Sequence, residues 1–219
     1  MQATFLILAV AAGSIAATAA PIYNTGVDNA FGLLPAGSGE IHYVVTGPGT
    51  DPYTTTVVAS NPGWYAVPPG SIGTATANWI TANTTGFASG ESSAQGGLYP
   101  YTYTGVFSGT TLSGNWAADN CGTMLIDSIA VSTIGGGADP GCVPTVAAFQ
   151  TLTAFNVTGL SDTTHSLQFQ VYNVLATPTG LFVDNLSTGG GVPEPSSVLL
   201  ALTGFGLLGL GIRRRQAAK

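Results

Sequence analysis

Basic side chains are almost absent from this sequence, which has only four Lys and Arg among 219 residues. All four lie at its end, at Arg213, Arg214, Arg215 and Lys219. The stretch 21–191 therefore holds nine carboxylates and no Lys or Arg. This argues against nucleic-acid binding, because neutralising phosphates requires cations. It also excludes Lys or Arg salt bridges within the stretch, so salt or a metal ion must screen the carboxylates.

Charged residues of every kind are scarce, since Asp, Glu, Lys and Arg make up only 6% of the chain. Coiled coils and long solvated helices are excluded, because their polar faces need such residues. Hydrophobic residues make up 45%, which is enough for a core and unlike an ordinary disordered chain. The length suits one domain with terminal extensions, whose polar surface is made from Ser, Thr, Asn, Gln and Gly.

Motifs of catalysis are also lacking. The only two histidines, His42 and His165, lie far apart without a local partner motif, so we interpret both as structural. No His-Glu-x-x-His, Gly-x-Ser-x-Gly or Lys-containing phosphate loop occurs. A glycosidase needs two placed carboxylates, and no spacing selects a pair. We expect a protein that is not an enzyme, with a surface hydrolase as the less favoured alternative.

The first residues predict a cleaved secretory signal peptide at 1–19. A short apolar run at 5–12 is followed by small residues, and Ala-Thr-Ala at 17–19 fits the small-x-small cleavage pattern. The absence of Lys and Arg before the run departs from the usual pattern. A buried N-terminal helix is the alternative, although the Ala-, Gly- and Thr-rich end would form a helix poorly.

The C-terminal end combines three features in order. A Val-Pro-Glu-Pro element follows a Gly-rich stretch, an apolar segment occupies 197–212, and three arginines come directly after it. The apolar segment is at the short end of the membrane-spanning range. Arginines stay on the cytoplasmic side, which places the preceding domain outside. An ordinary single-pass anchor is one interpretation of this arrangement.

The same arrangement closely resembles the PEP-CTERM sorting signal of bacterial surface proteins, and the resemblance covers 192–215. The sorting motif is carried by Val192, Pro193, Glu194 and Pro195, and the basic stop by Arg213, Arg214 and Arg215. The resemblance implies export and recognition by an exosortase, a membrane protease that processes the tail near Pro-Glu-Pro. It implies delivery through the inner membrane to the cell surface or the exopolysaccharide matrix.

Between the termini, short strand-like runs alternate with turn residues. Alternation is clearest at 166–174, where apolar residues alternate with Gln168, Gln170 and Tyr172. About ten such strands predict an all-β, two-sheet antiparallel sandwich of the jelly-roll type. We expect strands at 41–46, 54–60, 64–67, 77–80, 101–107, 111–116, 124–132, 151–157, 166–174 and 180–186. The predicted organisation is a signal peptide at 1–19, a sandwich at 20–187, a Gly linker at 188–191 and the sorting signal at 192–219. Within the sorting signal, we expect the motif at 192–196, a transmembrane helix at 197–212 and a basic tail at 213–219.

Several short motifs in this stretch resemble, in order, the galactose-binding-like sandwich often found before PEP-CTERM tails. The resemblance implies a sandwich fold and a broad expectation of carbohydrate binding. Glu40 stands where the pattern usually has Asp, and Asp127-Ser128 where it has an Asn-Gly turn. The motifs include Thr25-Gly26-Val27-Asp28-Asn29, Gly39-Glu40-Ile41-His42-Tyr43, Gly114-Asn115-Trp116-Ala117-Ala118-Asp119-Asn120 and His165-Ser166-Leu167-Gln168-Phe169.

Aromatic and polar side chains are the candidate ligand contacts. Tyr101, Tyr103 and Trp116 offer rings that stack on sugars, while Asp119 and Asn120 offer hydrogen bonds to hydroxyls. Alternating aromatic residues on a strand more often belong to a sandwich core, and that interpretation stays open. A non-catalytic polysaccharide-contacting or adhesion module is therefore the leading hypothesis, and a structural surface protein without a ligand is the alternative.

A calcium site and a disulfide are the remaining candidates. Asp28 and Glu40 provide hard oxygen ligands of the kind that suits Ca²⁺, but no dense Asp-x-Asp-x-Asp spacing occurs, and turn formation is the alternative. We expect no resident cofactor. Cys121 and Cys142 form an even pair in an exported stretch, which predicts a disulfide worth about 3 kcal/mol in the chain-entropy model. A reactive thiol pair is the alternative.

Overall fold

The computed structural model describes residues 20–48, 53–58, 64, 76–83, 96–137, 141–143, 147–161, 163–174 and 178–190. The predicted signal peptide at 1–19 and the sorting signal with its transmembrane segment at 197–212 lie outside the described residues. Within the described ranges, no helix is long and apolar enough to cross a membrane.

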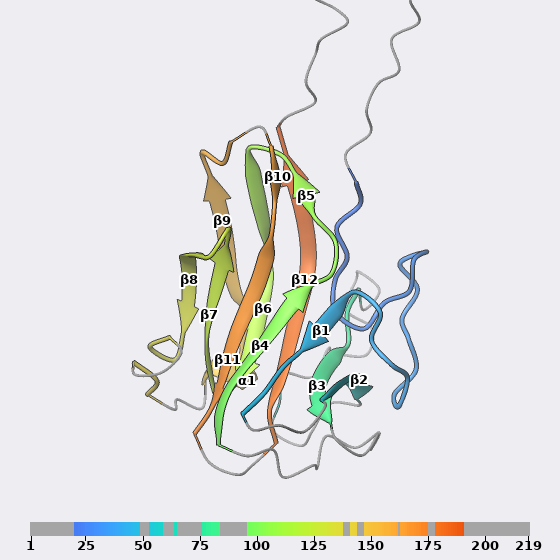
Figure 1. The fold of residues 1–219 in the computed structure, drawn as a ribbon, viewed down its shortest axis with the longest axis vertical. Helices are drawn as coiled ribbons and strands as arrows, with labels where there is room; N and C mark the ends of the chain where they lie inside the picture. Colours follow the sequence, from blue (N-terminus) through green and yellow to red (C-terminus); the bar gives the residue numbers. More distant parts are fainter. Residues whose placement is uncertain are drawn as a thin grey trace, which may run out of the picture. The chain divides into compact units, whose positions relative to one another are not determined.

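Two five-stranded sheets, with antiparallel pairing throughout, make up the fold (Figure 1). Sheet I consists, in order, of β1 (Tyr43–Val45), β4 (Gly97–Tyr103), β11 (Leu167–Asn173), β7 (Cys121–Ile126) and β8 (Ile129–Ile134). Sheet II consists of β2 (Thr54–Val58), β3 (Trp79–Asn83), β12 (Gly180–Gly189), β6 (Thr111–Asp119) and β9 (Thr153–Thr158). A short pair, β5 (Phe107–Ser108) with β10 (Thr164–His165), and a one-turn helix α1 (Ala147–Gln150) complete the described elements.

The hydrophobic core lies between the two sheets and contains residues from both. Period-two alternation turns every second side chain inward, as in β11, whose Leu167, Phe169 and Val171 are fully buried. The Trp116 ring of sheet II meets the Phe169 ring of sheet I with centroids 5.3 Å apart. The predicted all-β antiparallel sandwich is therefore confirmed, while its finer assignment to galactose-binding-like jelly rolls stays a prediction.

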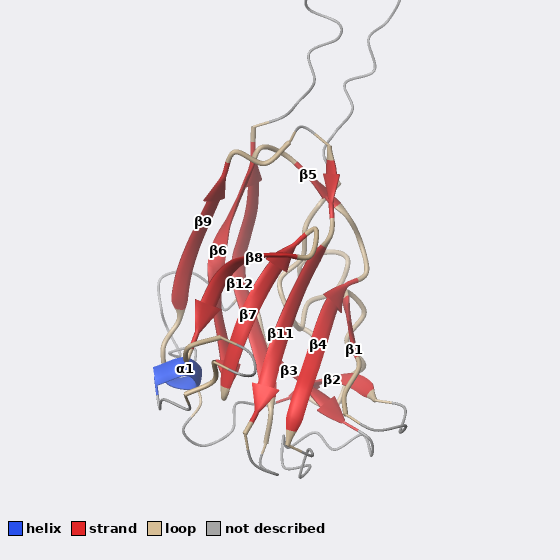
Figure 2. Ribbon diagram, turned by 60° about the vertical axis from the view of Figure 1, so that its left-hand side comes forward, coloured by secondary structure: helices blue, strands red, loops and turns tan. Residues whose placement is uncertain are grey.

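The outer sides of the two sheets differ. On sheet II, a second apolar cluster includes the outward side chains of Trp79 on β3 and Phe182 on β12. The Trp64 ring lies over Trp79, with centroids 4.4 Å apart, and it approaches Gly180 so closely that a Cβ there would lie 2.7 Å from it. Sheet I has no such cluster among the described residues, and Figure 2 shows its strands side by side in the front layer.

Four sequence predictions need correction at their boundaries. The strand predicted at 124–132 is a hairpin, because the chain turns at Asp127 and Ser128 between β7 and β8. The strand predicted at 101–107 is interrupted between β4 and β5. Trp64 is not in a strand, and the remainder of 64–67 lies outside the described residues. The linker predicted at 188–191 begins inside β12, whose last residues pair with β6.

Candidate functional site

Sheet I presents an outer surface without charged side chains. None of its five strands contains Asp, Glu, Lys, Arg or His. On β1, β4, β7 and β11, outward residues alternate with buried core residues. These outward residues are half-buried or exposed. We call this surface the neutral face, defined by Val44, Leu98, Pro100, Thr102, Thr123, Leu125, Gln168, Gln170 and Tyr172.

A hydrogen-bonded row of side chains runs along the middle of the neutral face. Gln170 Nε2 donates to Gln168 Oε1 over 3.2 Å, and Gln168 Nε2 donates to Thr102 Oγ1 over 3.0 Å. The register explains this row, because Gln168 on β11 stands directly opposite Thr102 on β4. Gln170 stands opposite Thr123 on β7. Both amides are therefore held in fixed directions before any ligand arrives.

The chemistry of the neutral face suits hydroxyl-bearing ligands. Amide and hydroxyl side chains donate and accept hydrogen bonds without carrying charge. Tyr172 stands two residues along β11 from Gln170 and adds an aromatic ring to the same side of the strand. The alternation at 166–174 already indicated that Gln168, Gln170 and Tyr172 point away from the core. Thr102 and Thr123 were missed, because the strands that place them beside β11 are remote in the sequence.

The aromatic residues predicted as ligand contacts are buried instead. Trp116 and Tyr101 are 0% exposed and Tyr103 is 5% exposed, and all three belong to the core between the sheets. Trp116 Nε1 donates to Ser132 Oγ over 3.2 Å, and the Tyr101 hydroxyl accepts from Ala82 N over 3.0 Å. Burial also raises the pKa of Tyr103. The prediction that these rings contact a ligand is wrong, because they occupy the inward positions of their strands.

Asp119 and Asn120 lie at the corner between β6 and β7, where their side chains bond to the protein. Asp119 Oδ2 accepts from Trp64 Nε1 over 2.7 Å, and its main-chain oxygen accepts from Thr179 Oγ1 over 2.9 Å. Asn120 Oδ1 accepts from Val174 N over 3.1 Å. Burial raises the pKa of Asp119 to about 6, although the bond from Trp64 lowers it. The bond from Trp64 to Asp119 therefore fixes Trp64, and with it the apolar cluster on the outside of sheet II, to the end of β6.

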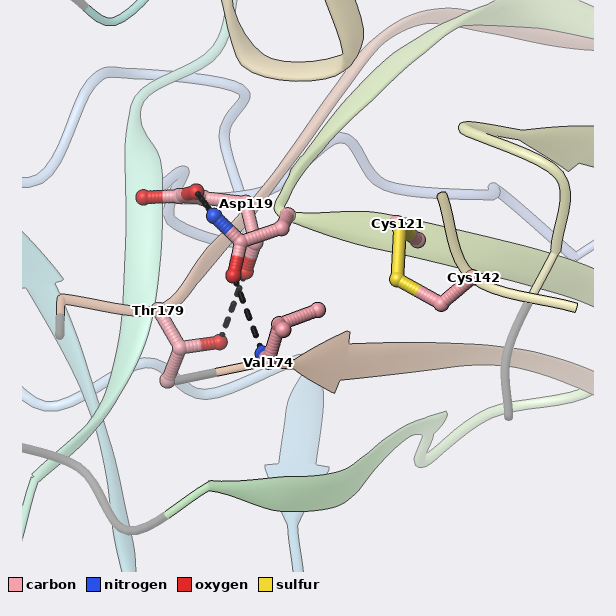
Figure 3. The surroundings of a disulfide bond; sticks show 6 residues. Asp119, Cys121, Cys142, Val174 and Thr179 are labelled. Atoms are coloured by element: carbon pink, nitrogen blue, oxygen red, sulfur yellow. Dashed lines mark hydrogen bonds between the residues drawn. A yellow bond between two sulfur atoms is a disulfide. The ribbon is translucent and has the colours of Figure 1, made fainter. Parts of the chain in front are cut away.

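The predicted disulfide between Cys121 and Cys142 is confirmed, with the two Cα atoms 5.7 Å apart. It joins the first residue of β7 to the segment that follows β8 (Figure 3). Main-chain bonding supports the same connection, because Val143 N donates to Gly135 O over 2.8 Å. The bond therefore fixes the segment beyond β8 to the start of β7.

Asp28 and Glu40, the candidate calcium ligands, both accept hydrogen bonds from the main chain. Asp28 Oδ1 accepts from two N–H groups of its own turn, each over 2.8 Å. Glu40 accepts from Gly26 N over 2.6 Å and from His42 N over 2.8 Å. Burial raises the pKa of Glu40, although these bonds lower it. No group of three or more His, Cys, Asp or Glu gathers for a metal within the described residues, and calcium stays a prediction.

The two histidines are both buried but differ in their partners. The His42 ring stacks on Tyr23 with centroids 3.8 Å apart, and its Nε2 has no hydrogen-bond partner among the described residues. Burial lowers the pKa of His42, although a bond to the main chain of Asp28 raises it. His165, by contrast, bonds through both ring nitrogens. Neither ring is placed against the neutral face.

Comparison with known proteins identifies the C-terminal end. Residues 191–215 match the PEP-CTERM protein-sorting motif. The chain carries a PEP-CTERM sorting signal. The match includes the predicted motif at Val192, Pro193, Glu194 and Pro195 and the three arginines. A PEP-CTERM signal implies an exported protein that an exosortase sorts at the membrane toward the cell surface.

No curated protein matches this chain. One solved structure that matches it is a mutant of a family 29 carbohydrate-binding module, with a TM-score of 0.34 and 16% sequence identity. The match covers 80% of this chain and 99% of that module. A likeness at this level gives no information about ligands. The sorting signal and the neutral face are the features of this chain that bear on its function.

Proposed function

We propose that this PEP-CTERM protein acts outside the cell as a non-catalytic module that contacts polysaccharide. The observation that carries the proposal is the neutral face, a hydrogen-bonding and charge-free surface on a domain that bears a sorting signal. Exported proteins of this kind meet the polymers of the cell surface and matrix first. Polysaccharides present hydroxyl groups at high density, and the side chains of the neutral face are suited to bind them.

The difference between the two sheets supports this assignment. Trp64, Trp79 and Phe182 lie in the apolar cluster on the outside of sheet II, so the part of that surface over β3 and the start of β12 is already occupied by the protein's own residues. Sheet I exposes its amides and hydroxyls on the opposite outer surface of the sandwich. Polar sites for small hydroxylated ligands need only a few well-placed donors and acceptors. The neutral face provides such donors and acceptors on a rigid sheet, which favours specific contact over non-specific adhesion.

Retention of the mature protein on the producer's own polysaccharide tests the proposal. The protein is purified from the producing cells and run in native gels with and without that polysaccharide, in the presence of either Ca²⁺ or EDTA. We expect slower migration in the polysaccharide gel and unchanged migration of serum albumin. Unchanged migration of the mature protein under both conditions would contradict the proposal.

A purely structural surface protein is the second candidate. The observation that favours it is that Gln168 and Gln170 already hydrogen-bond to side chains within the protein. This candidate predicts no retention on any polysaccharide, so the same gels separate the two proposals. Turnover of a polysaccharide that depends on one carboxylate would contradict both, and would favour a surface hydrolase.

A further inference from the structure

We propose that the neutral face selects uncharged glycans over acidic ones, because the negative field of the exported stretch repels acidic polymers, and that the row Gln170–Gln168–Thr102 binds the uncharged ones. The inference rests on the proposed function and names the ligand class of the same site. It follows from two independent observations, the distribution of charge over the exported stretch and the hydrogen-bonded arrangement of the amides.

Charge excludes acidic polymers from the neutral face. The stretch 21–191 has nine carboxylates and no Lys or Arg, so its own field is negative. The five carboxylates in the described residues belong to Asp28, Glu40, Asp119, Asp127 and Asp184, and all lie outside the strands of sheet I. A uronate or sulfate on this surface would lose water without meeting a Lys or Arg of the stretch, and the net negative charge of the stretch would repel it. An uncharged sugar avoids both penalties.

The hydrogen-bonded row adds a positive preference. Because Gln170 donates one N–H to Gln168, and Gln168 donates one to Thr102, each amide keeps a second N–H. Their direction is fixed by the first bond, so little side-chain freedom is lost when a sugar hydroxyl binds. The two amides repeat every second residue of one strand, at roughly 7 Å, and Tyr172 continues the row by the same step. A glycan lying along β11 meets these groups in succession.

The experiment uses the mature protein and the producer's own polysaccharide, separated by anion exchange into a neutral and an acidic pool. A portion of the acidic pool is chemically reduced at its carboxyl groups, which keeps the backbone and removes the charge. Binding is measured with EDTA present, at salt concentrations of about 0.1 M and 1 M, where the Debye length falls from about 10 Å to about 3 Å. We expect the acidic pool to bind at least tenfold more weakly than the neutral pool at low salt, with partial recovery at high salt. Carboxyl reduction should restore binding.

Variants locate the site. Gln170→Ala and Gln168→Ala should each weaken binding to the neutral pool about tenfold, as expected for the loss of one specific hydrogen bond. Thr158→Ala, an exposed position on β9 of sheet II, is the matched control and should bind as wild type. Thermal melts of all three variants show whether the fold is kept, and two separate glutamine variants protect the test against failure of either to fold.

The outcomes separate the two proposals. Retention on neither pool overturns the proposed function. Retention of wild type with equal or stronger binding to the acidic pool overturns the charge selectivity. If the Gln170→Ala and Gln168→Ala variants fold and bind the neutral pool as tightly as wild type, the assignment to this row is overturned. Polysaccharide contact by the protein would still stand.

Discussion

At the scale of single residues, His165 is the group whose charge the fold most clearly determines. Its Nδ1 lies 2.6 Å from Asp127 Oδ2, and its Nε2 lies 2.8 Å from the main-chain oxygen of Ser161. Both neighbours are acceptors, so both ring nitrogens must carry a proton to satisfy them. Burial by itself lowers the pKa of His165, but the bonds to Asp127 and Ser161 outweigh it, and the net pKa is raised.

This arrangement predicts a loss of stability with rising pH. The native state holds the proton of His165 at pH values where the unfolded chain has released it, so the contribution of His165 to stability is full below about pH 6.5 and is lost as pH rises through the raised native pKa. We expect the melting temperature of wild type to decrease between pH 6 and pH 8.5. His165→Gln should melt lower than wild type at pH 6 and show a flatter pH dependence. Parallel curves for the two proteins would refute the prediction.

Asp127 titrates in the opposite sense and provides the internal control. The bonds from His165 and Ser166 lower the pKa of Asp127, so its contribution is present near neutral pH and is lost as pH falls through its lowered native pKa. Asp127→Asn should therefore remove the same part of the pH dependence above pH 6 that His165→Gln removes. The double variant should then show the same pH dependence as either single variant in that range, because both substitutions remove the same bond between His165 and Asp127.

The buried aromatic residues show how far sequence alone reaches at this scale. Period two correctly groups Tyr101 and Tyr103 on one side of their strand. Which side faces the core depends on the neighbouring strands, because Tyr101 pairs in register with Val45 on β1 and Phe169 on β11. Those partners are remote in sequence, so local pattern could group the tyrosines but could not place them.

At the scale of elements, the β7–β8 hairpin shows a turn with an uncommon composition. Asp127 and Ser128 both have positive φ, at 50° and 67°, as a type I′ turn requires at its two central positions. The usual residues there are Asn and Gly, which tolerate the left-handed region. Because the run 124–132 has neither Asn nor Gly, its pattern predicted one continuous strand, although the resembled family has an Asn-Gly turn where Asp127 and Ser128 stand.

The same turn predicts a stabilising substitution. Ser128→Gly should raise the free energy of unfolding by about 1 kcal/mol, because glycine adopts positive φ without the penalty that a Cβ brings. That corresponds to a rise in melting temperature of about 2–4 °C for a domain of this size. Asp127 is kept, since it also binds His165.

Ala130→Gly on β8 is the matched control, since Ala130 is exposed and lies outside the positive-φ residues. Glycine in a strand loses chain entropy without any relief of strain, so this variant should melt lower than wild type. A Ser128→Gly variant that melts at or below the temperature of wild type would show that the turn is not strained at this position.

At the scale of the whole molecule, the PEP-CTERM signal was found from sequence and the neutral face was found only in part. The signal is a linear arrangement of a Pro-Glu-Pro motif, an apolar segment and arginines, and its residues are adjacent in the chain. The neutral face is assembled from strands that lie far apart in sequence, such as β4, β7 and β11. Composition did predict its character, since a stretch without Lys and Arg must build its surface from neutral polar residues.

Processing of the tail predicts the mass of the mature protein. We expect an intact mass that begins after residue 19 and ends near 193–195, because the exosortase is expected to act near Pro193, Glu194 and Pro195. Reduction should add about two hydrogens, as the bond between Cys121 and Cys142 opens. Mass spectrometry of protein from the producing cells measures both. A mass that extends to Lys219 would mean that the tail serves only as an anchor.

The position of β12 has a mechanical consequence for any load applied to the chain just before the sorting signal. β12 is the last strand of the described residues and lies in the middle of sheet II, between β3 and β6. Its register with β6 extends from Gly180 to Gly189, interrupted by an irregularity after Asp184. A pull on the chain after Gly189 acts along this strand, so it loads many ladder hydrogen bonds together in shear and does not peel them one by one. The sandwich is therefore built to resist tension applied at the end of β12.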